Sequence, residues 1–201
     1  MAKDIPSPAC DRLSSDVRTL PPPELATPNV RLHGTVDDLM LDRWLDQAAA
    51  LRIDAPLVLE LSTTGGDAEV GRRIADDVRL LRKAGRTTRF FGKTMIYSAG
   101  ATIMGGFLRE DRWLSRDAML MVHGRKLSKC LNLDGALRTQ RPAVEALLAE
   151  IECGIRLERV EFAKLIAGSG IGMDELERET LNDWYLPAAS ALERGLIAGV
   201  I

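Results

Sequence analysis

Residues 88–108 read TRFFGKTMIYSAGATIMGGFL, and three kinds of segment follow one another in them. Residues 88–91 form a short β-branched and aromatic run typical of a strand. Residues 99–108 are an apolar stretch, which indicates a buried helix. Ser98 stands between them, followed by the small residues Ala99 and Gly100. Since a helix directs its unpaired N–H groups toward the turn before it, a serine here can serve as an exposed nucleophile.

The same alternation of strand and helix recurs on both sides of this segment. Short apolar runs predict strands at residues 30–33, 56–61, 113–114 and 118–122. Helical spacing predicts amphipathic helices over residues 37–51 and 67–83. Their expected apolar faces are Leu39, Leu41, Trp44, Leu45 and Ala48 in the first helix, and Val70, Ile74, Val78 and Leu81 in the second. A βαβαβ alternation of this kind predicts an α/β fold with right-handed crossovers.

Three further regions complete the predicted organisation. Residues 1–28 hold six of the nine prolines and predict an extended or disordered arm, which leaves residues 29–201 as a single domain. Apolar residues at helical spacing predict a long helical region over about residues 133–166, with Pro142 starting or kinking it. Such a long helix on a small domain favours a homo-oligomer. A short charged helix near residue 174, an apolar WYLP segment and a helix over residues 188–194 precede the apolar end.

Composition excludes several classes of function. The net charge is −2, with 27 basic and 29 acidic residues, which argues against nucleic acid as a partner. No apolar run approaches the roughly 18 residues that span a bilayer, and residues 1–6 lack the apolar core of a signal peptide. The three cysteines show neither metal-ligand spacing nor a disulfide framework. We therefore expect a cytoplasmic protein that needs no metal or other cofactor.

The chain offers few partners for a nucleophilic Ser98. His123, at the end of the apolar strand 118–122, is one of only two histidines; the other, His33, better suits a solvated or capping role. The Gly65-Gly66 turn before a helix can expose an N–H group to an oxyanion. The acid that would orient His123 cannot be chosen from spacing, because there are 29 carboxylates. Asp183 stands out only because it precedes the apolar segment WYL.

Together these residues resemble the proteolytic subunit of the Clp protease, within the Clp protease/crotonase fold of repeated ββα (βαβ) units with a protruding handle helix. The resemblance covers residues 30–200, and its motifs are VRLHGTV (30–36), LELSTTGG (59–66), YSAGA (97–101), MVH (121–123), ERETLNDWYL (177–186) and ASALERGLI (189–197). It implies Ser98 as nucleophile, His123 as general base and Asp183 as the third member of a catalytic triad. The N–H groups of Gly66 and Ala99 would form the oxyanion hole.

The sequence departs from the family pattern at several positions. Thr64 replaces a proline, Ala99 replaces a methionine, and Gly124 and Arg125 replace a glutamine–proline pair. The segment between His123 and Asp183 is longer than usual; it contains the handle, about residues 127–170, which in the family joins two rings and helps bind peptide. These differences leave ring size, ring stacking and the substrate groove open. The proline-rich start does not resemble the family's axial loops, so docking of an AAA+ unfoldase also stays open.

The resemblance thus predicts a serine endopeptidase that hydrolyses small peptides or unfolded polypeptides through an acyl-enzyme, as a ring or as stacked rings. Three alternatives stay open. A serine–lysine peptidase would use Lys93 or Lys126 as base in place of His123. A crotonase-type enzyme would act on acyl-coenzyme A with the same oxyanion geometry but no need for Ser98. A non-catalytic scaffold subunit would carry the triad in a misaligned state.

Overall fold

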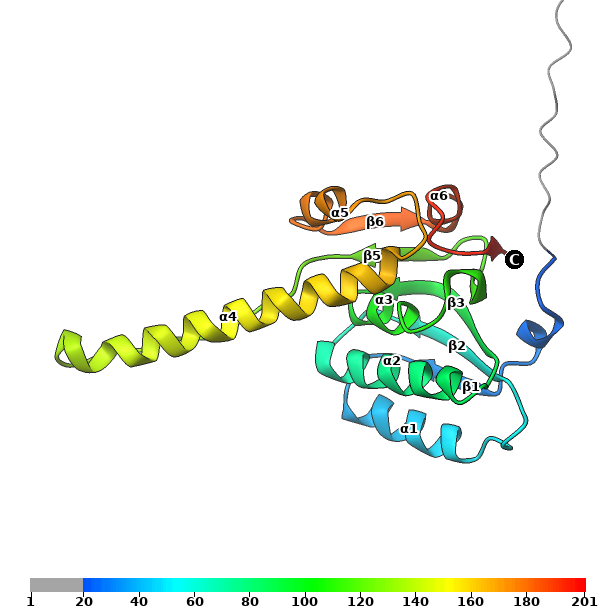
Figure 1. The fold of residues 1–201 in the computed structure, drawn as a ribbon, viewed down its shortest axis with the longest axis horizontal. Coiled ribbons are helices and arrows are strands. Elements are labelled where there is room, and N and C mark those ends of the chain that lie inside the picture. Colours follow the sequence, from blue (N-terminus) through cyan, green and yellow to red (C-terminus); the bar gives the residue numbers. More distant parts are fainter. Residues whose placement is uncertain (1–19) are drawn as a thin grey trace, which may run out of the picture.

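The computed structural model describes residues 20–201, which form one seven-stranded sheet flanked by helices (Figure 1). The strands are β1 (Val30–His33), β2 (Leu57–Thr63), β3 (Thr88–Tyr97), β4 (Arg112–Leu114), β5 (Met119–Val122), β6 (Trp184–Pro187) and β7 (Gly199–Val200). The α-helices are α1 (Asp38–Ala49), α2 (Ala68–Lys83), α3 (Ala99–Met104), α4 (Leu137–Ile166), α5 (Met173–Glu179) and α6 (Ala188–Glu193). Two 3₁₀-helices, η1 (Pro23–Ala26) and η2 (Arg109–Asp111), complete the described elements.

Strand β3 is the branch point of the sheet. The parallel order is β1-β2-β3-β4-β7, and β5 also pairs with β3. The first half of β3 pairs with β4 through residues 90–92, and its second half pairs with β5 through residues 95–97. β6 runs antiparallel to β5. Because β5 rather than β4 pairs with the second half of β3, the carboxyl end of β3 lies beside the carboxyl end of β5.

Alternation along the central strands creates a core on each side of the sheet. The main core lies under the helices and contains Trp44 of α1, Ile74 of α2 and Ile103 of α3. A smaller cluster on the other side joins Leu25, Val58, Phe91 and Trp113. Gly100 sits where α3 crosses β2; a Cβ there would lie 2.5 Å from Thr63 Cγ2, so glycine permits this close packing.

Helix α4 extends far beyond the sheet, and only Phe162 and Leu165 near its end are buried (Figure 1). The side chain of Arg112, almost fully buried, anchors that end by donating to the carbonyls of Lys164, Leu165, Phe107 and Leu196. Burial lowers the pKa of Arg112 to about 10. A cation satisfies the unpaired carbonyls of a helix C-terminus, so Arg112 fixes the base of the projecting helix.

Most predicted elements are present, but several expectations were wrong in detail. Strand β3 does not stop at residue 91; it continues to Tyr97 through an irregular Thr94 with φ 61°. The face of α1 is centred on Met40 and Trp44, and the predicted core residues Leu39 and Leu45 are exposed. The strands β6 and β7 were not predicted.

Two other predicted segments also differ from the structure at their ends. The long helix begins at Leu137 rather than near residue 133, and Pro142 lies inside it. Residues 1–19 of the predicted arm lie outside the described residues, but its last part is not extended. There Pro23–Ala26 form η1, and Leu25 is buried in the smaller core cluster. The division into an arm and one domain otherwise stays a prediction.

Residues 20–201 lack two features that would indicate other kinds of site. No helix in that range is both long and apolar enough to cross a membrane. The same range holds no group of His, Cys, Asp and Glu side chains that could bind a metal ion. Cys130 and Cys153 are exposed free thiols, and Cys10 lies outside the described residues.

Candidate active site

The carboxyl ends of three parallel strands meet at one edge of the sheet and bring Gly66, Ser98 and His123 together. Tyr97 at the end of β3 pairs with Met121 of β5, so Ser98 and His123 leave neighbouring strands at nearly the same level. Thr63 at the end of β2 pairs with Ile96, which places the glycine turn on the other side of Ser98. Gly66, Ser98, Ala99 and His123 all line one cavity of about 540 Å³.

Ser98 adopts a backbone conformation that few non-glycine residues adopt, with φ 54° and ψ −114°. Its N–H donates to the Met121 carbonyl at 2.8 Å, and it is the N-cap of α3 without a capping side-chain hydrogen bond. Gly65 packs directly on it: a Cβ on Gly65 would lie 2.6 Å from Ser98 Cβ. This sharp strand-to-helix turn leaves the Ser98 hydroxyl available at the cavity.

The predicted oxyanion donors are Gly66, in the glycine turn, and Ala99, the first residue of α3. Gly66 has φ 149°, and a Cβ there would lie 2.2 Å from the Val36 carbonyl oxygen, so only glycine fits. The backbone groups on either side of the Gly66 N–H are paired with Val36: Asp67 N–H donates to the Val36 carbonyl at 2.7 Å, and Val36 N–H donates to the Gly65 carbonyl. Among residues 20–201, the N–H groups of Gly66 and Ala99 donate to no protein acceptor. Two unpaired donors beside a serine can bind a developing oxyanion.

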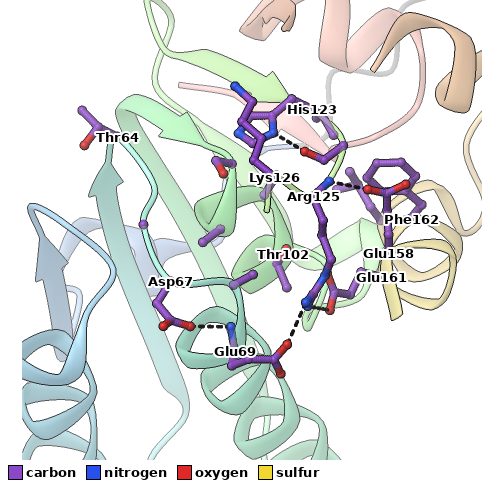
Figure 2. Close-up of a pocket in the computed structure, with 18 residues that line it drawn as sticks. Thr64, Asp67, Glu69, Thr102, His123, Arg125, Lys126, Glu158, Glu161 and Phe162 are labelled. Atoms are coloured by element: carbon purple, nitrogen blue, oxygen red, sulfur yellow. Dashed lines mark hydrogen bonds and ion pairs between the residues drawn. The ribbon is translucent and has the colours of Figure 1, made fainter. Parts of the chain in front are cut away.

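His123 and the proposed acid Asp183 lie close in the backbone but are not joined by a hydrogen bond in the described part of the chain. Val122 pairs with Trp184 in the β5–β6 ladder, so His123 and Asp183 are the next residues along that register. The His123 ring nitrogen Nδ1 lies 2.5 Å from the Gly124 carbonyl oxygen (Figure 2). The Asp183 carboxylate accepts from Lys126 Nζ at 3.2 Å and does not line the cavity.

A charged network forms the wall of the cavity opposite the glycine turn (Figure 2). Arg125 donates to Glu69 of α2 at 2.7 Å and to Glu161 of α4 at 2.8 Å. Arg72 contacts the same two carboxylates. Burial raises the pKa of Glu161 despite these cations, whereas at the more exposed Glu69 the two arginines outweigh burial and lower the pKa.

Comparison with known proteins identifies the family. The family model described as Clp protease matches residues 25–201. The chain belongs to the Clp protease family. It is 25% identical over 181 residues to the ATP-dependent Clp protease proteolytic subunit 2 of Treponema pallidum (strain Nichols), covering 88% of this chain and 83% of the relative. It is 26% identical over 175 residues to the ATP-dependent Clp protease proteolytic subunit of Paracoccus denitrificans, covering 86% and 80%.

Membership of the Clp protease family confirms the resemblance and the predicted fold class, a parallel α/β sheet with a long helix. It also supports a serine-type peptidase. The low identity marks a divergent member.

The charged network around Arg125 was not predicted from the sequence. The only signal was that Gly124 and Arg125 stand where the Clp family has a glutamine–proline pair. The two lysines predicted as alternative bases differ in their position relative to the cavity. Lys93 pairs with Glu60 at 2.7 Å and does not line the cavity, whereas Lys126 does line it.

Proposed function

We propose that this Clp protease family member is a serine endopeptidase in which Ser98 attacks the carbonyl carbon of a peptide bond. One observation carries the proposal: Ser98, His123 and the unpaired N–H groups of Gly66 and Ala99 line the same cavity. Nucleophile, base and oxyanion donors are the groups that acyl transfer requires.

In this mechanism His123 takes the Ser98 proton as the hydroxyl attacks, and the oxyanion is bound by Gly66 and Ala99. His123 then protonates the leaving amine, and water attacks the acyl-enzyme by the same route in reverse. Asp183 holds the imidazole in the productive tautomer. For this, Asp183 must exchange its contact with Lys126 for one with His123, and His123 must turn from the Gly124 carbonyl. The mechanism uses no cofactor.

The handle supports assembly into a homo-oligomer, as a ring or stacked rings. Leu148, Ile151 and Ile155 follow one another at spacings of three and four residues, so they share one face of α4, and all three are exposed. A repeated apolar stripe on a projecting helix favours burial against a second copy. Enclosure in such rings would restrict substrates to small peptides or unfolded polypeptides. Partnership with an AAA+ unfoldase and a cytoplasmic location remain predictions.

Features of the cavity bear on the alternatives. A serine–lysine mechanism would need Lys126 to leave Asp183 and approach Ser98, and the Ser98–His123 mechanism breaks the same contact, so this contact does not distinguish the two. A crotonase-type reaction would need available glutamates. Glu158 and Glu161 line the cavity, but both accept hydrogen bonds from Arg125. The glutamate contacts disfavour the crotonase-type reaction; the serine–lysine and scaffold alternatives are left to experiment.

The test is hydrolysis of fluorogenic peptides and of an unfolded protein such as casein by the purified chain. We expect cleavage by the wild type, and a loss of more than about 10³-fold in kcat for Ser98→Ala and for His123→Ala. His33→Ala is the matched control, because it removes the other histidine, and should stay active. Cleavage that survives in His123→Ala would favour the serine–lysine alternative, and no cleavage by the wild-type oligomer would favour a scaffold.

A further inference from the structure

Arg125 lies two residues after His123 and is held at both its backbone and its side chain. Its N–H donates to the Glu158 carboxylate of α4, and its guanidinium donates to Glu69 and Glu161. The preceding residue is also fixed, since Gly124 N–H donates to the Thr180 carbonyl at 3.0 Å. The segment that carries the base is thus tied to α2 and to the base of the handle, although it belongs to no helix or strand.

These contacts form a short path of connected residues from the turn that carries Gly66 to the segment that carries His123. Glu69 lies three residues after Gly66, in the first turn of α2. The Asp67 side chain accepts from the N–H groups of Glu69 and Val70, which makes this turn rigid. The path therefore runs from Gly66 through Glu69 to Arg125 and on to His123, across the cavity that Ser98 lines (Figure 2). Its central link is the Arg125–Glu69 contact.

Arg72 keeps the two bridging carboxylates in place independently of Arg125. It contacts Glu69 at 2.5 Å and Glu161 at 2.9 Å, yet it does not touch the segment that carries His123. Removal of Arg125 consequently leaves both carboxylates with a cation, so the variant should fold. Removal of Arg72 takes away the same charge from the same carboxylates but spares the link to His123. The two arginines form a matched pair.

We propose that Arg125 is a positioning residue, which sets His123 relative to the oxyanion donor Gly66 by clamping the segment after the base to α2 and α4. Arg125 touches no reacting atom in this account. It acts through the backbone of residues 123–125, which carries both the His123 side chain and the Gly124 carbonyl that His123 contacts. The catalytic consequence rests on the proposed peptidase function, whereas the effect on His123 itself does not.

The test compares Arg125→Met, Arg125→Lys and Arg72→Met with the wild type in peptide hydrolysis. A misplacement of the base of about 1 Å costs about 100-fold, so we expect kcat of Arg125→Met to fall by about that factor, with KM near the wild-type value. Arg72→Met should lose less than about fivefold, as for a partly exposed ion pair. Arg125→Lys keeps the charge but not the two-pronged contact and should fall between them.

A second readout does not depend on activity. The chain has two histidines, so ¹³Cε1-labelled histidine gives two NMR signals, assigned with His33→Gln. We expect Arg125→Met to shift or broaden the His123 signal and to leave His33 unchanged, while Arg72→Met moves neither. Equal signals and equal kcat in the two arginine variants would overturn the inference even where the wild type cleaves peptide. A wild type without activity would refute the peptidase proposal, and the NMR comparison would still decide the role of Arg125.

Discussion

Substitution of Gly65 by alanine tests whether the nucleophile turn depends on the close contact seen in the structure. Gly65 has φ 96°, and its Cβ would lie 2.6 Å from Ser98 Cβ and 3.0 Å from the Tyr97 carbonyl oxygen. Gly34 is the matched control, because it has φ 94° and nothing within 4 Å of its Cβ. Both variants force alanine into the left-handed region, but only Gly65→Ala also presses on Ser98.

The cost of the left-handed backbone conformation and the cost of overpacking against Ser98 can be estimated separately. The left-handed conformation costs an alanine about 1–2 kcal/mol, which is the whole effect expected for Gly34→Ala. Overpacking adds about 1–3 kcal/mol at Gly65, so Gly65→Ala should lower the free energy of unfolding by about 2–5 kcal/mol. In a Ser98→Gly background the methyl group meets no Cβ at position 98, so the cost of Gly65→Ala should fall, while the 3.0 Å contact with the Tyr97 carbonyl oxygen keeps it above that of Gly34→Ala.

Urea unfolding followed by tryptophan fluorescence measures these free energies, because Trp44 and Trp113 are buried. Acylation of Ser98 by a fluorophosphonate should also be lost in Gly65→Ala and retained in Gly34→Ala. Equal losses of stability in Gly65→Ala and Gly34→Ala, with equal acylation, would refute the view that Gly65 supports the Ser98 turn by direct contact.

Three further results are expected. Asp183→Asn should lower kcat by about 10²–10⁴-fold with little change in KM; activity equal to the wild type in peptide hydrolysis would exclude Asp183 from the triad. Leu148→Glu combined with Ile155→Glu should dissociate the oligomer in native mass spectrometry, and an unchanged mass would show that the handle stripe is not an interface. Burial raises the pKa of the Asp111 carboxyl above 3.8, although the charge of Arg89 opposes this shift. The stability that protonated Asp111 contributes is therefore present at acid pH and is lost as pH rises through the raised pKa. Asp111→Asn should therefore make the free energy of unfolding depend less on pH above 3.8 in urea titrations, and an unchanged pH dependence would contradict the shift.

The sequence predicted the βαβ alternation because its helices and parallel strands are long enough to show their periods. It did not predict β6, because residues 184–187 end in a proline and run antiparallel to β5, outside the βαβ alternation. Their pairing with β5 joins segments that are far apart in the chain. The face of α1 was misassigned because apolar residues occur on both sides of that helix, and only packing shows that Met40 rather than Leu39 is buried.

At the site, local motifs placed Gly66, Ser98, Ala99 and His123 after the ends of strands, and the structure shows that all four line one cavity. Their catalytic roles remain a proposal. The contacts of Asp183 were beyond the sequence, because an aspartate on an exposed turn can pair with any nearby cation, here Lys126. The network around Arg125 was also beyond it, because Glu69, Arg125 and Glu161 lie on three separate elements and meet only through the tertiary fold.

The most direct test of the account is intact mass after treatment of the assembled protein with a fluorophosphonate, on the wild type beside Ser98→Ala and His123→Ala. The account predicts one adduct per wild-type chain, located on the peptide that contains Ser98, and none on either variant. An unmodified wild type, or an adduct that persists in Ser98→Ala, would contradict the claim that Ser98 is an activated nucleophile.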